Sequence, residues 1–141
     1  MANPRKRPAS LADARTLLRR AKVFLDVAKQ IDADRVGDEP FVDSAAATLC
    51  ILGGIAASDS ACAKALGFIP KGQNHREACA FLAQVMVGRR SGTRASRALA
   101  DLLAMKDEAQ YGVIYLSGEK LRSVFRRVEV IIDFAEAVLG P

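Results

Sequence analysis

The sequence contains no tryptophan and few other aromatic residues, which make up 6% of its 141 residues. Half of the residues are hydrophobic, and alanine is prominent among them. A β-sandwich would need more aromatic and β-branched side chains, so this composition favours closely packed helices. A chain of this length is typical of one domain and can bury about two-thirds of its unfolded surface.

Cysteine is scarce as well, with only Cys50, Cys62 and Cys79, all in apolar surroundings. On one helix Cys50 and Cys62 would lie roughly 18 Å apart, too far for a disulfide. No spacing of cysteine and histidine indicates a metal site, and we expect neither a metal nor a cofactor. The three thiols are therefore expected to be reduced, as in a cytoplasmic protein.

Long apolar runs are also missing. The first residues, MANPRKRPAS, are basic, but no apolar run follows them, so we predict no signal peptide. The most apolar stretch, residues 44–57, is shorter than a membrane-spanning helix requires. These absences predict a cytoplasmic protein without a membrane partner.

Established catalytic motifs are absent from the sequence. It has no Walker loop, no GxSxG, no HExxH and no carboxylate cluster suited to Mg²⁺. Catalysis would therefore depend on a sparse set of Lys, Arg, His, Asp and Tyr residues. Such a set can cleave RNA without a metal: a base deprotonates the 2′-hydroxyl nucleophile, and a cation stabilises the phosphorane.

The net charge of +5 favours encounters with nucleic acid or anionic surfaces. The positive charge gathers in two clusters that are candidates for binding nucleic acid, although each could also be an ordinary solvated surface. The first cluster opens the chain and the second lies in its middle: Arg5, Lys6 and Arg7, then Arg89, Arg90, Arg94 and Arg97.

The spacing of apolar residues predicts an all-α antiparallel bundle of four to five helices over residues 10–141, after a flexible basic arm at residues 1–9. Ser10 and Asp13 have the spacing of a capping box for the first helix. Gly53 and Gly54 fall within the second helix, where they would allow a neighbouring backbone to approach closely. The expected helices cover approximately residues 10–32, 43–66, 74–86, 93–110 and 117–139.

Four polar residues are candidates for catalysis. Lys106 continues the apolar stripe of the fourth helix, five residues before Tyr111, and Asp59 continues an apolar stripe of the second. A pair between Lys106 and Asp59 across the bundle would lower the cost of burying either charge, with or without a function. His75 is the only histidine and lies at a helix start, where it could also be a capping contact. Tyr111 could equally be a half-buried anchor at a helix end.

Three stretches resemble the higher-eukaryote and prokaryote nucleotide-binding (HEPN) superfamily and cover most of residues 43–139. They are DSAAATLCILGGIAASDSACAKAL, GQNHREACAFL and LADLLAMKDEAQYGVIYLSGEKLRSVFRRVEVIIDFAEAVL. The resemblance implies a four- to five-helix bundle that forms a homodimer with the two copies facing across a cleft. Many members are ribonucleases, often toxins or phage-defence components. It also implies a cognate partner, such as an antitoxin or a nucleotidyltransferase-like protein.

The family's motif is an arginine, four to six residues, and a histidine. At the matching place this sequence has Lys106 and Tyr111, so both motif residues are replaced. Lysine can hold a phosphate, but without the bidentate fork of arginine. Tyrosine, with an ordinary pKa near 10, is a weak base at neutral pH.

Two functions follow as expectations. In the first, the protein binds or cleaves RNA or a nucleotide: Lys106 holds the phosphate, Asp59 orients Lys106, and Tyr111 and His75 contact or activate the nucleotide. In the second, it is a non-catalytic helical interaction protein whose basic clusters bind an acidic partner or a nucleic acid backbone.

Overall fold

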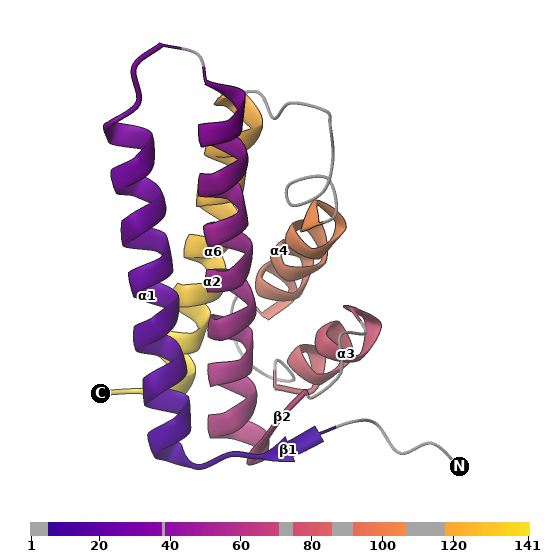
Figure 1. The fold of residues 1–141 in the computed structure, drawn as a ribbon. Helices are drawn as coiled ribbons and strands as arrows, with labels where there is room; N and C mark the ends of the chain where they lie inside the picture. Colours follow the sequence, from indigo (N-terminus) through magenta and orange to yellow (C-terminus); the bar gives the residue numbers. More distant parts are fainter. Residues whose placement is uncertain (1–5, 38, 71–74, 86–91, 107–117) are drawn as a thin grey trace.

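The computed structural model describes residues 6–37, 39–70, 75–85, 92–106 and 118–141, and it is an all-α bundle, as predicted (Figure 1). Two short strands accompany the helices in these residues. The elements are β1 (Lys6–Pro8), α1 (Leu11–Ala33), α2 (Pro40–Leu66), β2 (Phe68–Pro70), α3 (His75–Val85), α4 (Gly92–Ala104) and α6 (Gly118–Leu139).

Helix α1 begins as its sequence predicts. The Ser10 hydroxyl accepts a hydrogen bond from the Asp13 backbone N–H at 3.1 Å, and the Asp13 carboxylate accepts one from the Ser10 N–H at 2.8 Å. This reciprocal capping box satisfies two donors that a helix start otherwise leaves unpaired. The two hydrogen bonds also hold the pKa of Asp13 below its usual value.

Helix α2 is the central helix and packs against α1, α3, α4 and α6. It ends at Gly67, whose φ of +77° gives the left-handed cap predicted for a glycine stop. Residues 41–66 are long and apolar enough to cross a membrane by length and composition alone. In the most apolar window, however, 56% of the residues are buried inside the bundle, as in a core helix.

The directions of the long helices follow from their contacts. Ser60 of α2 donates a hydrogen bond to the Ala14 carbonyl of α1, while a Cβ at Gly53 would lie 3.2 Å from the Ala21 carbonyl oxygen. Helix α1 is therefore antiparallel to α2, and the close approach expected at Gly53 is confirmed. The ion pairs Lys22–Glu136 and Lys29–Glu129 show that α1 is antiparallel to α6 as well (Figure 1).

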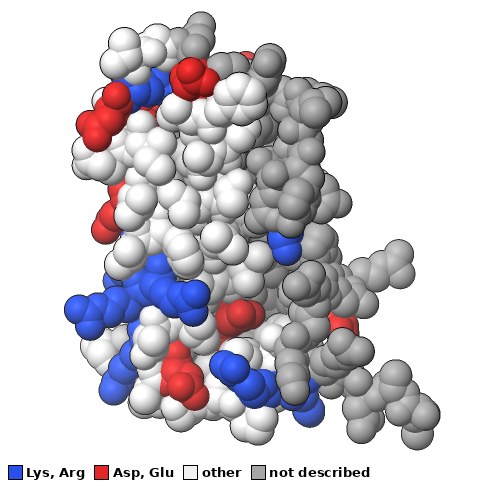
Figure 2. Space-filling model, viewed as in Figure 1, with Lys and Arg blue, Asp and Glu red and all other residues white. Residues whose placement is uncertain are grey.

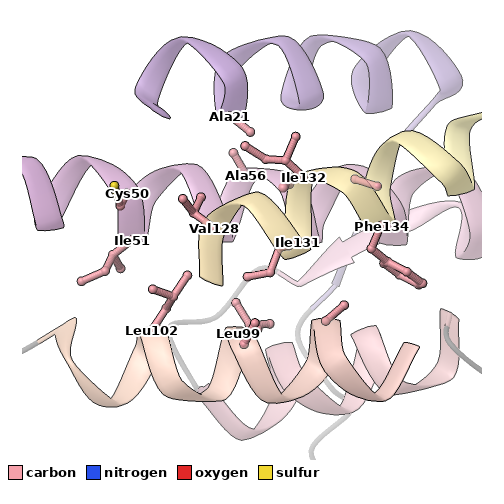
Figure 3. Packing of buried hydrophobic residues seen from close by; sticks show 14 of the residues in the cluster. Ala21, Cys50, Ile51, Ala56, Leu99, Leu102, Val128, Ile131, Ile132 and Phe134 are labelled. Atoms are coloured by element: carbon pink, nitrogen blue, oxygen red, sulfur yellow. The ribbon is translucent and has the colours of Figure 1, made fainter. Parts of the chain in front are cut away.

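All five helices named above contribute buried residues to the main core, and side chains of α2, α4 and α6 meet in it (Figure 3). Fully buried side chains from these helices fill it, among them Ile51, Leu99, Leu102, Val128 and Ile131. Two of the three cysteines, Cys50 and Cys62, are buried as free thiols, and burial raises the pKa of each to about 12. The prediction of unpaired thiols in apolar surroundings is therefore confirmed for these two residues.

The two strands join the N-terminal arm to the segment that follows α2. Lys6, Arg7 and Pro8 pair antiparallel with Pro70, Ile69 and Phe68, and the Ala9 N–H donates to the Gly67 carbonyl at 3.0 Å. Residues 6–9 of the predicted flexible arm are therefore joined by backbone hydrogen bonds to the residues that follow α2. Residues 1–5 lie outside the described residues.

Candidate nucleic-acid interface

A groove of about 390 Å³ runs between α4 and α6, and arginine is its most frequent lining residue. Helices α4 and α6 each bury an apolar face in the core. The polar residues beside these two buried faces border the groove. Its lining consists of Thr93, Arg94, Arg97, Ala98 and Asp101 from α4, and Ser123, Arg126, Arg127 and Val130 from α6.

One of the four arginines is already engaged within the protein. The Arg127 Nε lies 3.0 Å from the Asp101 carboxylate on the opposite wall. Its Nη1 also donates to the Ser123 carbonyl at 3.2 Å and to the Ser123 hydroxyl. These contacts tie α6 to α4 and fix the position of one guanidinium, with about a third of its side chain exposed.

The other three arginines, Arg94, Arg97 and Arg126, are exposed and form no hydrogen bond or ion pair within the described residues. Asp101 is the single acidic residue of the lining, and it already forms an ion pair with Arg127. The next acidic residues along α6, Glu129 and Asp133, do not line the groove, and Glu129 is paired with Lys29 of α1. The groove therefore presents three guanidinium groups whose charge is not neutralised by the described residues around them.

The groove continues toward the end of α4. A second hollow shares Asp101, Ser123 and Arg127 with it and extends to Ala104, Met105 and Lys120. Lys106 follows Met105 directly and is half-buried. The position where the sequence predicts the site is therefore adjacent to one end of the basic groove.

Asp59 does not contribute to this groove, and the pair predicted between Asp59 and Lys106 does not form. A Cβ at Gly54 would meet Leu102, which fixes where α2 and antiparallel α4 cross. From that crossing, Asp59 lies roughly 7 Å along α2 in one direction and Lys106 roughly 6 Å along the chain in the other. Burial raises the pKa of Asp59 to about 7, and the charge that partly opposes this shift is that of Arg7.

The remaining candidate residues fall in three groups. Lys6 and Arg7 lie on β1, where the Lys6 ammonium sits 4.6 Å from the centre of the Phe68 ring. His75 begins α3, but its side chain is not among those described. Tyr111, Arg5, Arg89 and Arg90 lie outside the described residues, as does the whole stretch from 107 to 117.

Sequence reasoning missed Arg126 and Arg127. They are some thirty residues from Arg94 and Arg97 and look like part of the solvated face of the last helix. The available signal was their place beside the apolar stripe of α6, which includes Val124 and Val128. That signal alone does not say which helix packs on that side.

Two further observations limit the chemistry of the site. Within the described parts of the chain, no three His, Cys, Asp or Glu residues are grouped so that they could hold a metal ion. No family model matches the chain, and no curated protein shows significant similarity to it. A function therefore has to be inferred from the groove itself.

Proposed function

We propose that this protein binds RNA through the phosphate backbone, in the groove between α4 and α6. The observation that carries the proposal is the set of three exposed guanidinium groups, Arg94, Arg97 and Arg126, without a described acidic partner. Guanidinium is weakly hydrated and can hold a phosphate through two parallel hydrogen bonds. The resemblance to HEPN proteins supports RNA or a nucleotide as the ligand.

The lining of the groove favours contacts with phosphates over contacts with bases. Its apolar part consists of Ala98 and Val130, and it contains no aromatic side chain among the described residues. Proteins that hold single strands by their bases stack them on aromatic rings. The arginines alone would fix the strand without selecting a sequence, because phosphates carry no sequence information.

The experiment measures binding of a labelled single-stranded RNA by fluorescence anisotropy at several salt concentrations. The double variant Arg94→Gln with Arg97→Gln removes two charges from the groove. We expect the affinity at low salt to fall about tenfold or more. We expect the slope of log K against log salt to become shallower by about 1.4, since two phosphate contacts are lost and each contact with a single strand contributes about 0.7.

The matched control removes the same two charges elsewhere. Arg15→Gln with Arg19→Gln changes two exposed arginines of α1 that border a different groove, between α1 and α6. This control should bind RNA within about twofold of the wild type, since only long-range attraction is lost. Equal losses in both double variants, or no binding by the wild type at low salt, would contradict the proposal.

Cleavage of the bound RNA is a second candidate function, and the place of Lys106 favours it. Lys106 directly follows Met105, which lines the hollow that continues the groove, so a strand that follows the groove would reach the part of the chain that carries Lys106. The protein would then be a metal-independent ribonuclease of the toxin or phage-defence type. We expect RNA cleavage in the presence of EDTA, its loss in Lys106→Ala and Tyr111→Phe, and unchanged RNA binding by Tyr111→Phe.

A further inference from the structure

The bundle leaves one long face of α1 and α2 without a covering helix among the described residues (Figures 1 and 2). We refer to it as the α1–α2 face and define it by Phe24, Val27 and Ile31 of α1 and Leu52 and Ile55 of α2. All five side chains are exposed or half-buried, and Val27 is 45% exposed. In Figure 2 it is a broad area without charged residues.

The apolar residues of the two helices form one continuous surface. Val27 and Ile31 of α1 share a hollow of about 460 Å³ with Val42 of α2. Further along, Phe24 packs beside Gly53, the neighbour of Leu52, where the two backbones approach closely. Single exposed apolar residues are common on protein surfaces, but a continuous patch over two helices is typical of an interaction site.

The charges at the two ends of this face have opposite signs. At one end lie Arg20, whose guanidinium is 5.8 Å from the Phe24 ring, and the β1 residues Lys6 and Arg7. This end also carries two carboxyl groups, those of Asp13 and the partly buried Asp59, against its three cations, so its net charge is positive.

The other end of the face is acidic. Asp34 ends α1 and Glu39 caps α2, and both border the hollow that Val27 lines. The cation at this end, Arg35, is engaged with Asp32 and with the buried Asp43. The uncharged middle of the face therefore has a basic end and an acidic end.

We propose that a second copy of this chain packs on the α1–α2 face with its helices antiparallel to those of the first. A two-fold axis that lies in the plane of the interface and is perpendicular to the helices places the Arg20 end of each copy against the Asp34 and Glu39 end of its partner. A parallel arrangement would place like charges together at both ends. The residues lining the α4–α6 groove are not part of this contact, so both copies keep their grooves open.

Sedimentation equilibrium of the full chain, over a wide concentration range, tests the contact. The wild type should form a dimer. Val27→Glu should raise the dissociation constant by at least about tenfold, since each copy brings one introduced charge and the dimer would bury both. The matched control Leu11→Glu changes an apolar residue that is 41% exposed, also on α1 but outside the face. It should dissociate like the wild type.

A charge exchange tests the direction of the helices. Arg20→Glu and Asp34→Arg should each raise the dissociation constant about fivefold, and the two together should restore it to near the wild-type value. Circular dichroism confirms that each variant is folded. Failure of the double variant to restore dimerisation would overturn the antiparallel arrangement. A chain that stays monomeric at every concentration, or that associates only with phosphatidylserine-containing vesicles, would overturn the dimer.

Discussion

The contact between Gly54 and Leu102 offers a quantitative test of how α4 packs on α2. A Cβ at Gly54 would lie 2.6 Å from Leu102 Cδ1, closer than side-chain atoms pack. Leu102 is fully buried, so its branch has no solvent to move into (Figure 3). Gly54→Ala gains about 1 kcal/mol of helix propensity but must repack a filled core, which costs about 1–3 kcal/mol. We expect a net loss of about 1 kcal/mol in the free energy of unfolding.

The second variant, Leu102→Ala, removes the atoms that the new methyl group would meet. Alone it should cost about 2–5 kcal/mol, because it leaves a cavity at the centre of the bundle. In the double variant the methyl group introduced at position 54 enters that cavity without a clash, and the gain in helix propensity is kept. The double variant should therefore be more stable than the sum of the single changes predicts, by about 1–2 kcal/mol.

The neighbouring glycine provides the control. A Cβ at Gly53 would lie 3.2 Å from the Ala21 carbonyl oxygen and 3.3 Å from Phe24 Cβ, both on α1. Gly53→Ala and Leu102→Ala share no contact, so their effects should add within about 0.5 kcal/mol. Urea denaturation followed by circular dichroism measures all five variants. Additivity of Gly54→Ala with Leu102→Ala would refute the packing of α4 described here.

Three more predictions concern polar residues on α2. Ser60→Ala should lower the free energy of unfolding by about 1 kcal/mol, because its buried hydroxyl donates to the Ala14 carbonyl at 2.6 Å. Ser58→Ala should be neutral or stabilising in the same urea titration, since the buried Ser58 hydroxyl has no partner among the described residues. Asp59 has a pKa raised from 3.8 to about 7, so the folded protein binds a proton that the unfolded chain releases, and stability falls between about pH 4 and pH 7. Asp59→Asn should therefore unfold at higher urea than the wild type at pH 8 but not at pH 4, and an equal difference at both would contradict this.

The helices were predictable because local physical chemistry determines them. The period of apolar residues marks the buried stripe of α6, and the capping box at Ser10 and the glycine at position 67 mark two helix ends. Gly53 was predictable for a related reason, since a glycine within a helix costs stability unless a neighbour needs the space. All of these signals lie within a few residues of the feature they predict.

Features that depend on contacts between distant segments were not predictable in the same way. The pairing of β1 with β2 joins Lys6–Pro8 to Phe68–Pro70, and three-residue strands carry almost no alternating pattern. The pair expected between Asp59 and Lys106 had a sound energetic reason, because each residue continues an apolar stripe. It fails because α2 and α4 are antiparallel, so the two residues lie in opposite directions from their crossing point at Gly54 and Leu102.

The basic groove depends both on residues close together in the sequence and on contacts between distant segments. Sequence reasoning identified Arg94 and Arg97 as one cluster with Arg89 and Arg90, because it measured distance along the chain. The structure places Arg94 and Arg97 of α4 in the same groove as Arg126 and Arg127 of α6. The last two are consecutive, but successive residues of a helix point about 100° apart. Arg127 therefore reaches Asp101 while Arg126 stays open, and the pairing of α4 with α6 that creates the groove also neutralises one of its four charges. A count of arginines along the chain cannot separate the paired Arg127 from the open Arg126. The charge available to a phosphate backbone depends on that difference.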